Sequence, residues 1–212
     1  MMKLNHVITL IIGLLAWNHG KAQSEQIVTT ASKNWTAFNR NVKFENGEIH
    51  LSDSAGDGVL WLNEVDFRNG LIELDLKGKN TPGKSFVGIA FHGLDNQTFD
   101  AIYFRPFNFN NLSRNIHSIQ YVSMPENDWS VLRNTFPGKY ENSIAPVPEP
   151  VDTWFHVKIE IMYPSLLVYV NGSEEATLQV EQISERDNGK IGLWVGNGSE
   201  GWFKNLTLIS VK

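Results

Sequence analysis

The sequence predicts an all-β fold in which two antiparallel sheets pack as a sandwich. Many short runs alternate apolar and polar residues, which is the pattern of strands that bury one face. Gly, Pro and Asn separate these runs, and signals for helix starts are scarce. Regular short strands with turn residues between them are typical of β-sandwiches.

Residues 1–22 have the pattern of a signal peptide. Lys3 supplies the positive start, residues 7–17 are the apolar stretch, and Gly20 and Ala22 are small residues at the two positions that a signal peptidase reads. We predict cleavage after Ala22. The apolar stretch is too short for a membrane-spanning helix, and no second hydrophobic run follows. We therefore expect a secreted or periplasmic protein without membrane insertion.

Residues 23–212 are expected to form a single domain, because β-sandwiches of this length are common. The sequence has no Cys, which excludes disulfides and thiolate metal sites, so a hydrophobic core has to stabilise the fold. The net charge is −5 and Lys and Arg form no basic run, which argues against nucleic acid as a partner. Nothing in the sequence indicates an oligomeric state.

Four strands are predicted in the first half of the chain. The clearest is 70–77, where Ile72, Leu74 and Leu76 alternate with charged residues. The others are residues 42–51, 59–63 and 85–92, with turns at residues 56–58 and 78–84.

Two aromatic-rich strands, 99–107 and 116–124, come next. By the two-residue strand period, one face of the first strand carries Ala101, Tyr103, Arg105 and Phe107, and the other carries Ile102 and Phe104. In the second strand, His117 and Tyr121 share one face and Gln120 lies on the other. One face can therefore enter a core while the other offers a phenol, a guanidinium group and an aromatic ring.

A long loop follows this strand pair and holds Trp129, Arg133 and Tyr140. Asp128 is a helix-start signal, so residues 127–134 are expected to form one or two helical turns. A long loop beside an aromatic sheet face is usually functional. We interpret this region as a sugar-binding face with a loop over one edge.

The remaining predicted strands are residues 154–161, 166–170, 176–180, 190–195 and 203–211. Asn171 and Gly172 form a strong hairpin signal after the second of these. Trp194 and Trp202, near the C-terminal hairpin, are expected to pack in the core and at an edge.

Five motifs follow one another in a familiar order: FRNGLIELDLKG, SFVGIAFHG, DAIYFRPFNF, WFHVKIEI with LLVYVNG, and GKIGLWVGNGSEGWFKNLTL. Over residues 35–212 the chain resembles the concanavalin A-like lectin and glucanase superfamily. Within it, the chain is most similar to secreted bacterial 3-keto-disaccharide hydrolases and to laminin G-type modules. The resemblance implies a jelly-roll sandwich with one concave sheet. It identifies the fold more than the activity, because members include enzymes, lectins and adhesive modules.

The family 16 glycoside hydrolases of this superfamily present Glu, Asp and Glu at alternating positions of one strand. The corresponding strand of this chain has Tyr103 and Arg105 there, so it cannot supply the carboxylate pair of a retaining mechanism. Glu73 and Asp75 match in part, but their strand comes one step too early in the superfamily order. The resemblance leaves open 3-keto-sugar chemistry, in which a ring ketone acidifies a neighbouring C–H and elimination needs one base and one acid.

Tyr103 and Arg105 are the first candidates for substrate binding, because Arg can fork onto hydroxyls or a carboxylate and Tyr can stack on a sugar. Alternatively, Arg105 pairs with Asp100 or Glu141 and fixes the loop. The other candidates for substrate binding are Gln120, Tyr121, Trp129 and Arg133. Trp129 could instead plug the loop onto the sandwich.

His92 and His117 are the candidate catalytic residues, since either could act as a general base near neutral pH. The alternative for each is a structural, hydrogen-bonded His. No His-x-His or clustered acidic spacing predicts a metal site, so no cofactor is expected. Some members of the superfamily carry a structural Ca²⁺, and the sequence leaves that open.

We therefore expect a carbohydrate-active protein that acts on glycans or keto-disaccharides at the concave sheet face, as a glycoside hydrolase. The rival expectation is a non-catalytic, lectin-like carbohydrate-binding module. A laminin G-type adhesion module would fit the fold but explains the strand with Tyr103 and Arg105 less well. An enzyme needs a titrating group within hydrogen-bond reach of the sugar, whereas a binding module needs only platforms and amides.

Overall fold

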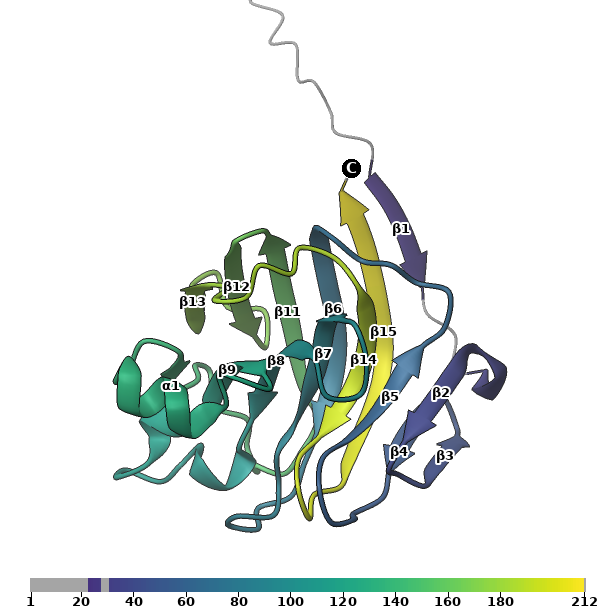
Figure 1. Cartoon of the computed structure of the whole chain (residues 1–212). Coiled ribbons are helices and arrows are strands. Elements are labelled where there is room, and N and C mark those ends of the chain that lie inside the picture. The colour runs from purple at the N-terminus through teal and green to yellow at the C-terminus, as the bar shows by residue number, and fades with distance from the viewer. Residues whose placement is uncertain (1–22, 28–30, 212) are drawn as a thin grey trace, which may run out of the picture.

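Two antiparallel sheets pack face to face in the computed structural model, which describes residues 23–27 and 31–211 (Figure 1). This confirms the predicted all-β sandwich. The predicted signal peptide, residues 1–22, lies outside the described residues.

The larger sheet has eight strands in the order β13-β12-β11-β6-β15-β4-β3, with β1 paired to β15. Their bounds are β1 (Gln23–Ile27), β3 (Val42–Glu45), β4 (Glu48–Leu51), β6 (Gly70–Lys77), β11 (Phe155–Met162), β12 (Ser165–Val170), β13 (Leu178–Glu181) and β15 (Gly201–Val211).

The other sheet has seven strands in the order β10-β9-β8-β7-β14-β5-β2. Their bounds are β2 (Trp35–Phe38), β5 (Gly58–Leu62), β7 (Val87–Gly93), β8 (Phe99–Phe104), β9 (Ile119–Met124), β10 (Glu141–Asn142) and β14 (Lys190–Val195). Most predicted strands are therefore present within a few residues of their expected bounds, while β1, β2 and β10 were not predicted.

The hydrophobic core lies between the inward faces of the two sheets. Ile72 and Leu74 of β6 are fully buried, as the alternation in that strand predicted. The seven-stranded sheet contributes residues such as Ile89, Ile102 and Phe104 from its own inward face. Each such apolar side chain contributes about 1.5–3 kcal/mol when it leaves water. Because this face of the seven-stranded sheet is used by the core, the opposite face is left to form a site.

Two Asn-Gly pairs make tight hairpin turns. The predicted single strand 42–51 is wrong, because Asn46 and Gly47 both have positive φ (52° and 79°) and turn the chain back between β3 and β4. Positive φ at both central residues suits the turn that matches strand twist, and Asn and Gly tolerate it best. The predicted turn at Asn171 and Gly172 is confirmed, with φ of 50° and 73°.

The two aromatic strands are shorter than predicted. After β8, Pro106 opens a 3-10 helix, η2 (Pro106–Asn108), because Pro has no N–H for the strand ladder. A second 3-10 helix, η3 (Asn115–His117), precedes β9, so His117 does not lie on the strand face that was predicted for it.

The helix predicted near residues 127–134 is α1 (Trp129–Thr135), which lies beside β9 (Figure 1). Asp128 caps it as predicted, since its carboxylate accepts hydrogen bonds from the backbone N–H groups of Ser130 and Val131, both at 2.8 Å.

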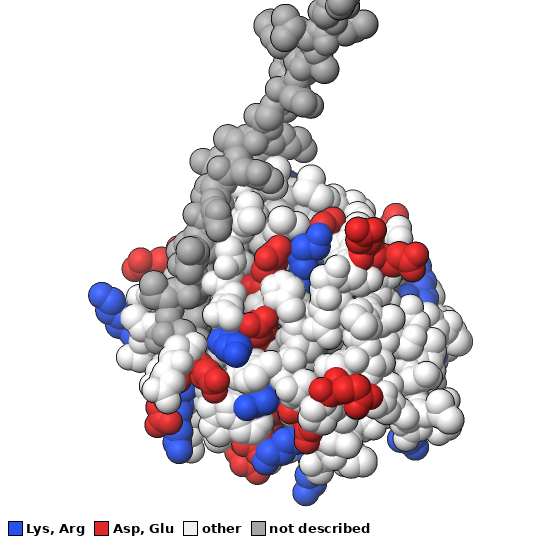
Figure 2. All heavy atoms as spheres, turned by 180° about the vertical axis from the view of Figure 1, so that it is seen from behind, with Lys and Arg blue, Asp and Glu red and all other residues white. Residues whose placement is uncertain are grey.

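Positive and negative side chains are interspersed on the face seen in Figure 2, without a large patch of one sign. Among the described residues, no helix is long and apolar enough to cross a membrane.

Candidate functional site

The outer face of the seven-stranded sheet carries three adjoining pockets, which together we call the groove. The central pocket has a volume of about 190 Å³ and is lined by Asp57, Phe86, Tyr103, Val122, Met124, Asp128, Trp129, Trp194, Gly196 and Asn197. The arginine pocket, of about 210 Å³, is lined by Gly83, Phe86, Arg105, Phe107, Asn108, Arg114, His117, Trp129 and Arg133. The amide pocket, of about 400 Å³, includes Asn39, Asn96 and Gln97.

Shared lining residues join these pockets in a row. The central and arginine pockets share Phe86 and Trp129, and the central and amide pockets share Asp57 and Met124. The groove therefore has a cationic end, an aromatic middle and an amide-lined end.

Gly88 of β7 has no side chain, so the backbone of β8 at Tyr103 can approach β7 closely. In the register of the strands, Tyr103 of β8 is opposite Gly88 of β7 on one side and opposite Gln120 of β9 on the other. A Cβ on Gly88 would come within 2.1 Å of the Ile102 carbonyl oxygen and 2.6 Å of the Tyr103 Cα. Only Gly fits at this approach, so the floor of the groove depends on it.

Tyr103 is the centre of the aromatic middle. Its ring centroid lies 5.1 Å from that of Trp194, in a tilted arrangement, and 6.0 Å from that of Phe86, edge to face. Its hydroxyl oxygen accepts a hydrogen bond from Nη2 of Arg105 at 2.5 Å. Burial raises the pKa of Tyr103 to about 12, against the opposing charge of Arg105. Tyr103 is therefore a neutral phenol at physiological pH.

Arg105 lines the arginine pocket and contacts Tyr103 of the central pocket. Its side chain follows β8 on the face of Tyr103, as predicted, and its guanidinium carbon lies 4.8 Å from the centroid of the Tyr103 ring. Nη1 donates to the carbonyl oxygen of His117 at 2.9 Å. The alternative pairing of Arg105 with Asp100 or Glu141 is not found, because Arg186 pairs with Asp100 and Arg133 pairs with Glu141.

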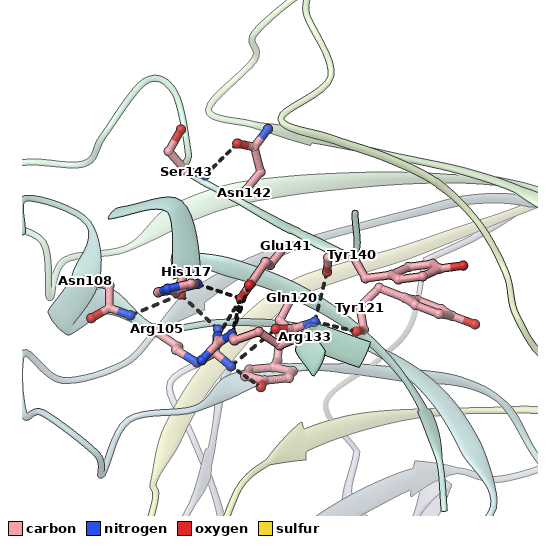
Figure 3. Close-up of polar contacts among 11 residues, drawn as sticks. Arg105, Asn108, His117, Gln120, Tyr121, Arg133, Tyr140, Glu141, Asn142 and Ser143 are labelled. Carbon is pink, nitrogen blue, oxygen red and sulfur yellow. Dashed lines mark hydrogen bonds and ion pairs between the residues drawn. The ribbon is translucent and has the colours of Figure 1, made fainter. Parts of the chain in front are cut away.

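Glu141 pairs with two residues that line the arginine pocket, His117 and Arg133 (Figure 3). It stands in β10 opposite Gln120 and is 4% exposed. Its Oε1 accepts from Nε of Arg133 at 2.9 Å, and its Oε2 accepts from Nδ1 of His117 at 2.7 Å. Burial alone would raise the pKa of Glu141, but hydrogen bonds from Arg133 and His117 outweigh it and hold the pKa below its usual value.

The ionised Glu141 sets the state of the His117 ring. A carboxylate can only accept a hydrogen bond, so Nδ1 of His117 has to carry the proton between them. In the neutral imidazole, Nε2 then has the free lone pair, and His117 lines the arginine pocket. This arrangement can take a proton from a molecule bound in the pocket.

Trp129 offers the most exposed aromatic surface of the groove. It begins α1, is 47% exposed and lines both the central and the arginine pocket. The guanidinium carbon of Arg133 lies 5.0 Å from its ring centroid. The alternative role predicted for Trp129, as a plug between loop and sandwich, does not fit this exposure.

Asp57 is the acidic group between the central and amide pockets. Burial raises its pKa, and this outweighs a hydrogen bond from the Asn197 backbone and the charge of Arg40. A carboxyl with a raised pKa retains its proton more readily and can give it to a bound molecule.

Two predicted substrate-binding residues, Tyr121 and Gln120, line none of the three pockets. Tyr121 is opposite Ile102, so it points into the sandwich, where its hydroxyl donates to Asp100 at 2.6 Å. Gln120 is on the face of Tyr103, but its Nε2 donates to the carbonyl oxygens of Tyr121 and Tyr140. The prediction that His117 and Tyr121 share a strand face is wrong, because His117 lies in η3, before β9 begins.

His92 also stays away from the groove. It is fully buried, with Nε2 2.9 Å from the carbonyl oxygen of Arg68 and Nδ1 3.0 Å from Oε1 of Gln182. Both ring nitrogens are held by structural partners, which matches the structural alternative for this residue.

Sequence reasoning did not assign several residues of the groove to a site. Glu141 was considered only as a partner of Arg105, Asp57 only as part of a turn with too few oxygen ligands for Ca²⁺, and Phe86 and Arg114 were not singled out. Trp194 was expected to pack in the core, and it does so at 6% exposure, but it also lines the central pocket. Strand alternation in β14 puts Trp194 on the other face of the strand from the inward-facing Leu193, and this could have indicated its position. Glu141, Asp57 and Arg114 come from loop and edge segments without such a period.

No group of three or more His, Asp or Glu among the described residues is arranged to hold a metal ion.

A model of one protein family, described as a 3-keto-alpha-glucoside-1,2-lyase-like domain, matches residues 16–209. No curated protein matches the chain in sequence.

Several solved structures share the fold at low sequence identity. A Parabacteroides distasonis protein, provisionally described as a glycosyl hydrolase, has a TM-score of 0.62 at 13% identity, covering 89% of this chain and 100% of that one. The carbohydrate-binding module CBM66 from Bacillus subtilis has a TM-score of 0.59 at 15% identity, covering 82% and 95%. The exoplasmic/lumenal domain of VIP36, bound to Ca²⁺ and Man3GlcNAc, has a TM-score of 0.58 at 12% identity, covering 89% and 88%. At these identities the likeness shows the fold, and the predicted lectin-like jelly roll is confirmed.

Proposed function

The chain belongs to the family of 3-keto-alpha-glucoside-1,2-lyase-like domains, and we propose that its groove binds 3-keto-glycosides and cleaves them by elimination. The observation that carries this proposal is the pairing of His117 with the buried Glu141, 2.7 Å apart, at the wall of a pocket. It gives a base of defined orientation without the carboxylate pair of ordinary glycosidases.

A ring ketone at C3 acidifies the hydrogen at C2, so a single base can begin the reaction. Nε2 of His117 takes the proton from C2, and the electron pair of the C–H bond moves into an enolate whose charge rests on the C3 oxygen. The guanidinium groups of the arginine pocket supply positive charge for that oxygen. His117 becomes a cation stabilised by Glu141.

The enolate then expels the glycosidic oxygen from C1. The C1–O bond breaks, a double bond forms between C1 and C2, and the leaving oxygen takes a proton. Asp57 is the proposed donor, because it lines the central pocket and burial raises the pKa of its carboxyl. Water carries the proton from His117 back to Asp57, so the products are a 1,2-unsaturated 3-keto sugar and a free alcohol.

The aromatic middle of the groove would position the sugar. Trp129 presents an exposed ring there, while Tyr103 and Trp194 line the pocket but are almost fully buried, and aromatic rings cover the apolar faces of sugars well. The same features would serve a non-catalytic binding module, which is the second candidate function. The half-exposed Trp129 is the observation that favours it.

Incubation with a 3-keto-glucoside separates these two functions. Release of the alcohol and formation of the conjugated enone, followed by chromatography and ultraviolet absorbance, would support the lyase. The variant His117→Gln should lose the reaction, whereas His156→Gln should retain it. His156 is a matched control, since its Nδ1 is 2.9 Å from Asp75 in the same kind of pair but on the eight-stranded sheet.

Binding without turnover would support the binding module. Equal product formation with His117→Gln and with the native protein, at the rate seen without protein, would also support it.

The predicted signal peptide leads us to propose also that the protein is exported. Mass spectrometry of the N-terminus after expression in a secreting host would test this.

A further inference from the structure

The arginine pocket carries more positive charge than the elimination of a neutral sugar requires. Arg105, Arg114 and Arg133 line it together with His117. The acidic side chain that contacts this group is Glu141, and it is already engaged by Arg133 and His117. The excess is local, because the chain as a whole has a net charge of −5.

Arg105 is a buried cation that makes no close ion pair with any described residue, although Glu141 is near enough for its charge to act on the guanidinium group. It is 6% exposed, and it donates to a carbonyl oxygen of His117 and to the hydroxyl of Tyr103, which are neutral. It forms no ion pair with any residue that the structure describes. A buried charge is costly to leave without a counter-charge. Burial lowers the pKa of Arg105, and the charge of Glu141 opposes this shift without cancelling it.

Arg114 is an exposed cation at the rim of the same pocket. Within the described part of the chain its guanidinium group makes no ion pair, so its donors are free to meet a ligand. The planar fork of a guanidinium group matches the two oxygens of a carboxylate or a sulfate.

We propose that the arginine pocket binds an anionic substituent of the saccharide, so that the substrate class is an acidic sugar with a carboxylate or a sulfate group. This inference rests on the proposed function in one respect, namely that a saccharide occupies the groove. Phe86 and Trp129, which line both pockets, would then contact the ring whose substituent enters the arginine pocket.

Titration calorimetry with methyl glucoside, methyl glucuronide and methyl glucoside 6-sulfate tests the proposal. None of these probes has a ketone, so binding is measured apart from turnover. We expect at least one anionic probe to bind about tenfold more tightly than the neutral one, because hydrogen bonds to charged groups are the stronger class. The preference should decrease with added salt. Comparison of the two anionic probes separates carboxylate from sulfate, and equal affinities for all three probes would overturn the proposal.

Arg114→Gln should reduce the ratio of anionic to neutral affinity several-fold and leave folding intact, because the residue is exposed. Arg68→Gln is the control for net charge: its side chain is 66% exposed and pairs with Asp187 outside the groove. It should leave the ratio unchanged. An unchanged ratio in Arg114→Gln, or the same loss in Arg68→Gln, would overturn the assignment to this pocket. Failure of the elimination with the preference intact would refute the lyase alone.

Discussion

Replacement of Glu141 by Gln removes one negative charge from the centre of the site with little change of shape. The native carboxylate accepts hydrogen bonds from Arg133 and His117, whose side chains are 31% and 30% exposed. A hydrogen bond to a charged group contributes about 1.5–3 kcal/mol. Since solvent screens both partners, we discount the sum and expect Glu141→Gln to lose about 2–3 kcal/mol of unfolding free energy at neutral pH. Urea denaturation would measure this.

The loss should depend on pH in a defined direction. The folded-state pKa of Glu141 lies below its usual value, because Arg133 and His117 outweigh the effect of burial. Such a group stabilises the fold above its unfolded-state pKa, and this stabilisation disappears as the pH falls through the folded-state pKa. The difference between the native protein and Glu141→Gln should therefore be full at about pH 7 and should decrease below about pH 4.5. A difference that stayed constant into acid would refute the reasoning.

Glu200 provides the matched control. It accepts from Nε2 of His50 at 2.9 Å and pairs with Lys79, outside the groove, and its pKa is also lowered because these partners outweigh burial. Glu200→Gln should show the same direction of pH dependence and retain elimination of 3-keto-glycosides. Glu141→Gln should lose most of that activity, since His117 loses the carboxylate that orients it. Equal activity in the two variants would contradict the role of Glu141.

Three further changes test other parts of the groove. Trp129→Ala should weaken glycoside binding by about tenfold with little change in melting temperature, because the ring is 47% exposed; calorimetry that showed unchanged affinity would exclude a stacking role. Asp57→Asn should raise the melting temperature at neutral pH, because a carboxyl with a raised pKa destabilises the fold once the pH rises through that pKa and the group ionises. It should also lower turnover, since the proposed proton donor is lost. A lower melting temperature at neutral pH would contradict this. Gly88→Ala should cost about 3 kcal/mol of unfolding free energy, since its Cβ would lie 2.1 Å from a backbone oxygen; native-like stability in urea would show that β7 and β8 do not approach so closely.

The strand period predicted part of the site correctly. Tyr103 and Arg105 were expected on one face of their strand, and both line the groove. The period could not show which residues of the next strand join them. That depends on register, and the observed register places Gln120 beside Tyr103 while Tyr121 faces the core. A shift of one residue would reverse this assignment.

Loop and edge residues were harder to predict. His117 lies in a 3-10 helix rather than a strand, and Glu141 reaches it from a two-residue strand at the sheet edge, 24 residues further along the chain. No local pattern links two such positions. Their contact exists because β10 pairs with β9 and brings the carboxylate back over the pocket.

The sequence alone was enough to predict the all-β class, most strand positions, the helix cap at Asp128 and the hairpin at Asn171 and Gly172. These features depend on neighbouring residues, because alternation, capping and turn conformation are set within a few positions of the chain. Only the tertiary structure decided that His117, Glu141 and Arg133 form one cluster, that Arg105 makes no close ion pair within the described residues, and that His92 is buried in the interior. Those outcomes depend on strand pairing and burial between distant segments, and the free energy of a contact is defined only once both of its partners are in place.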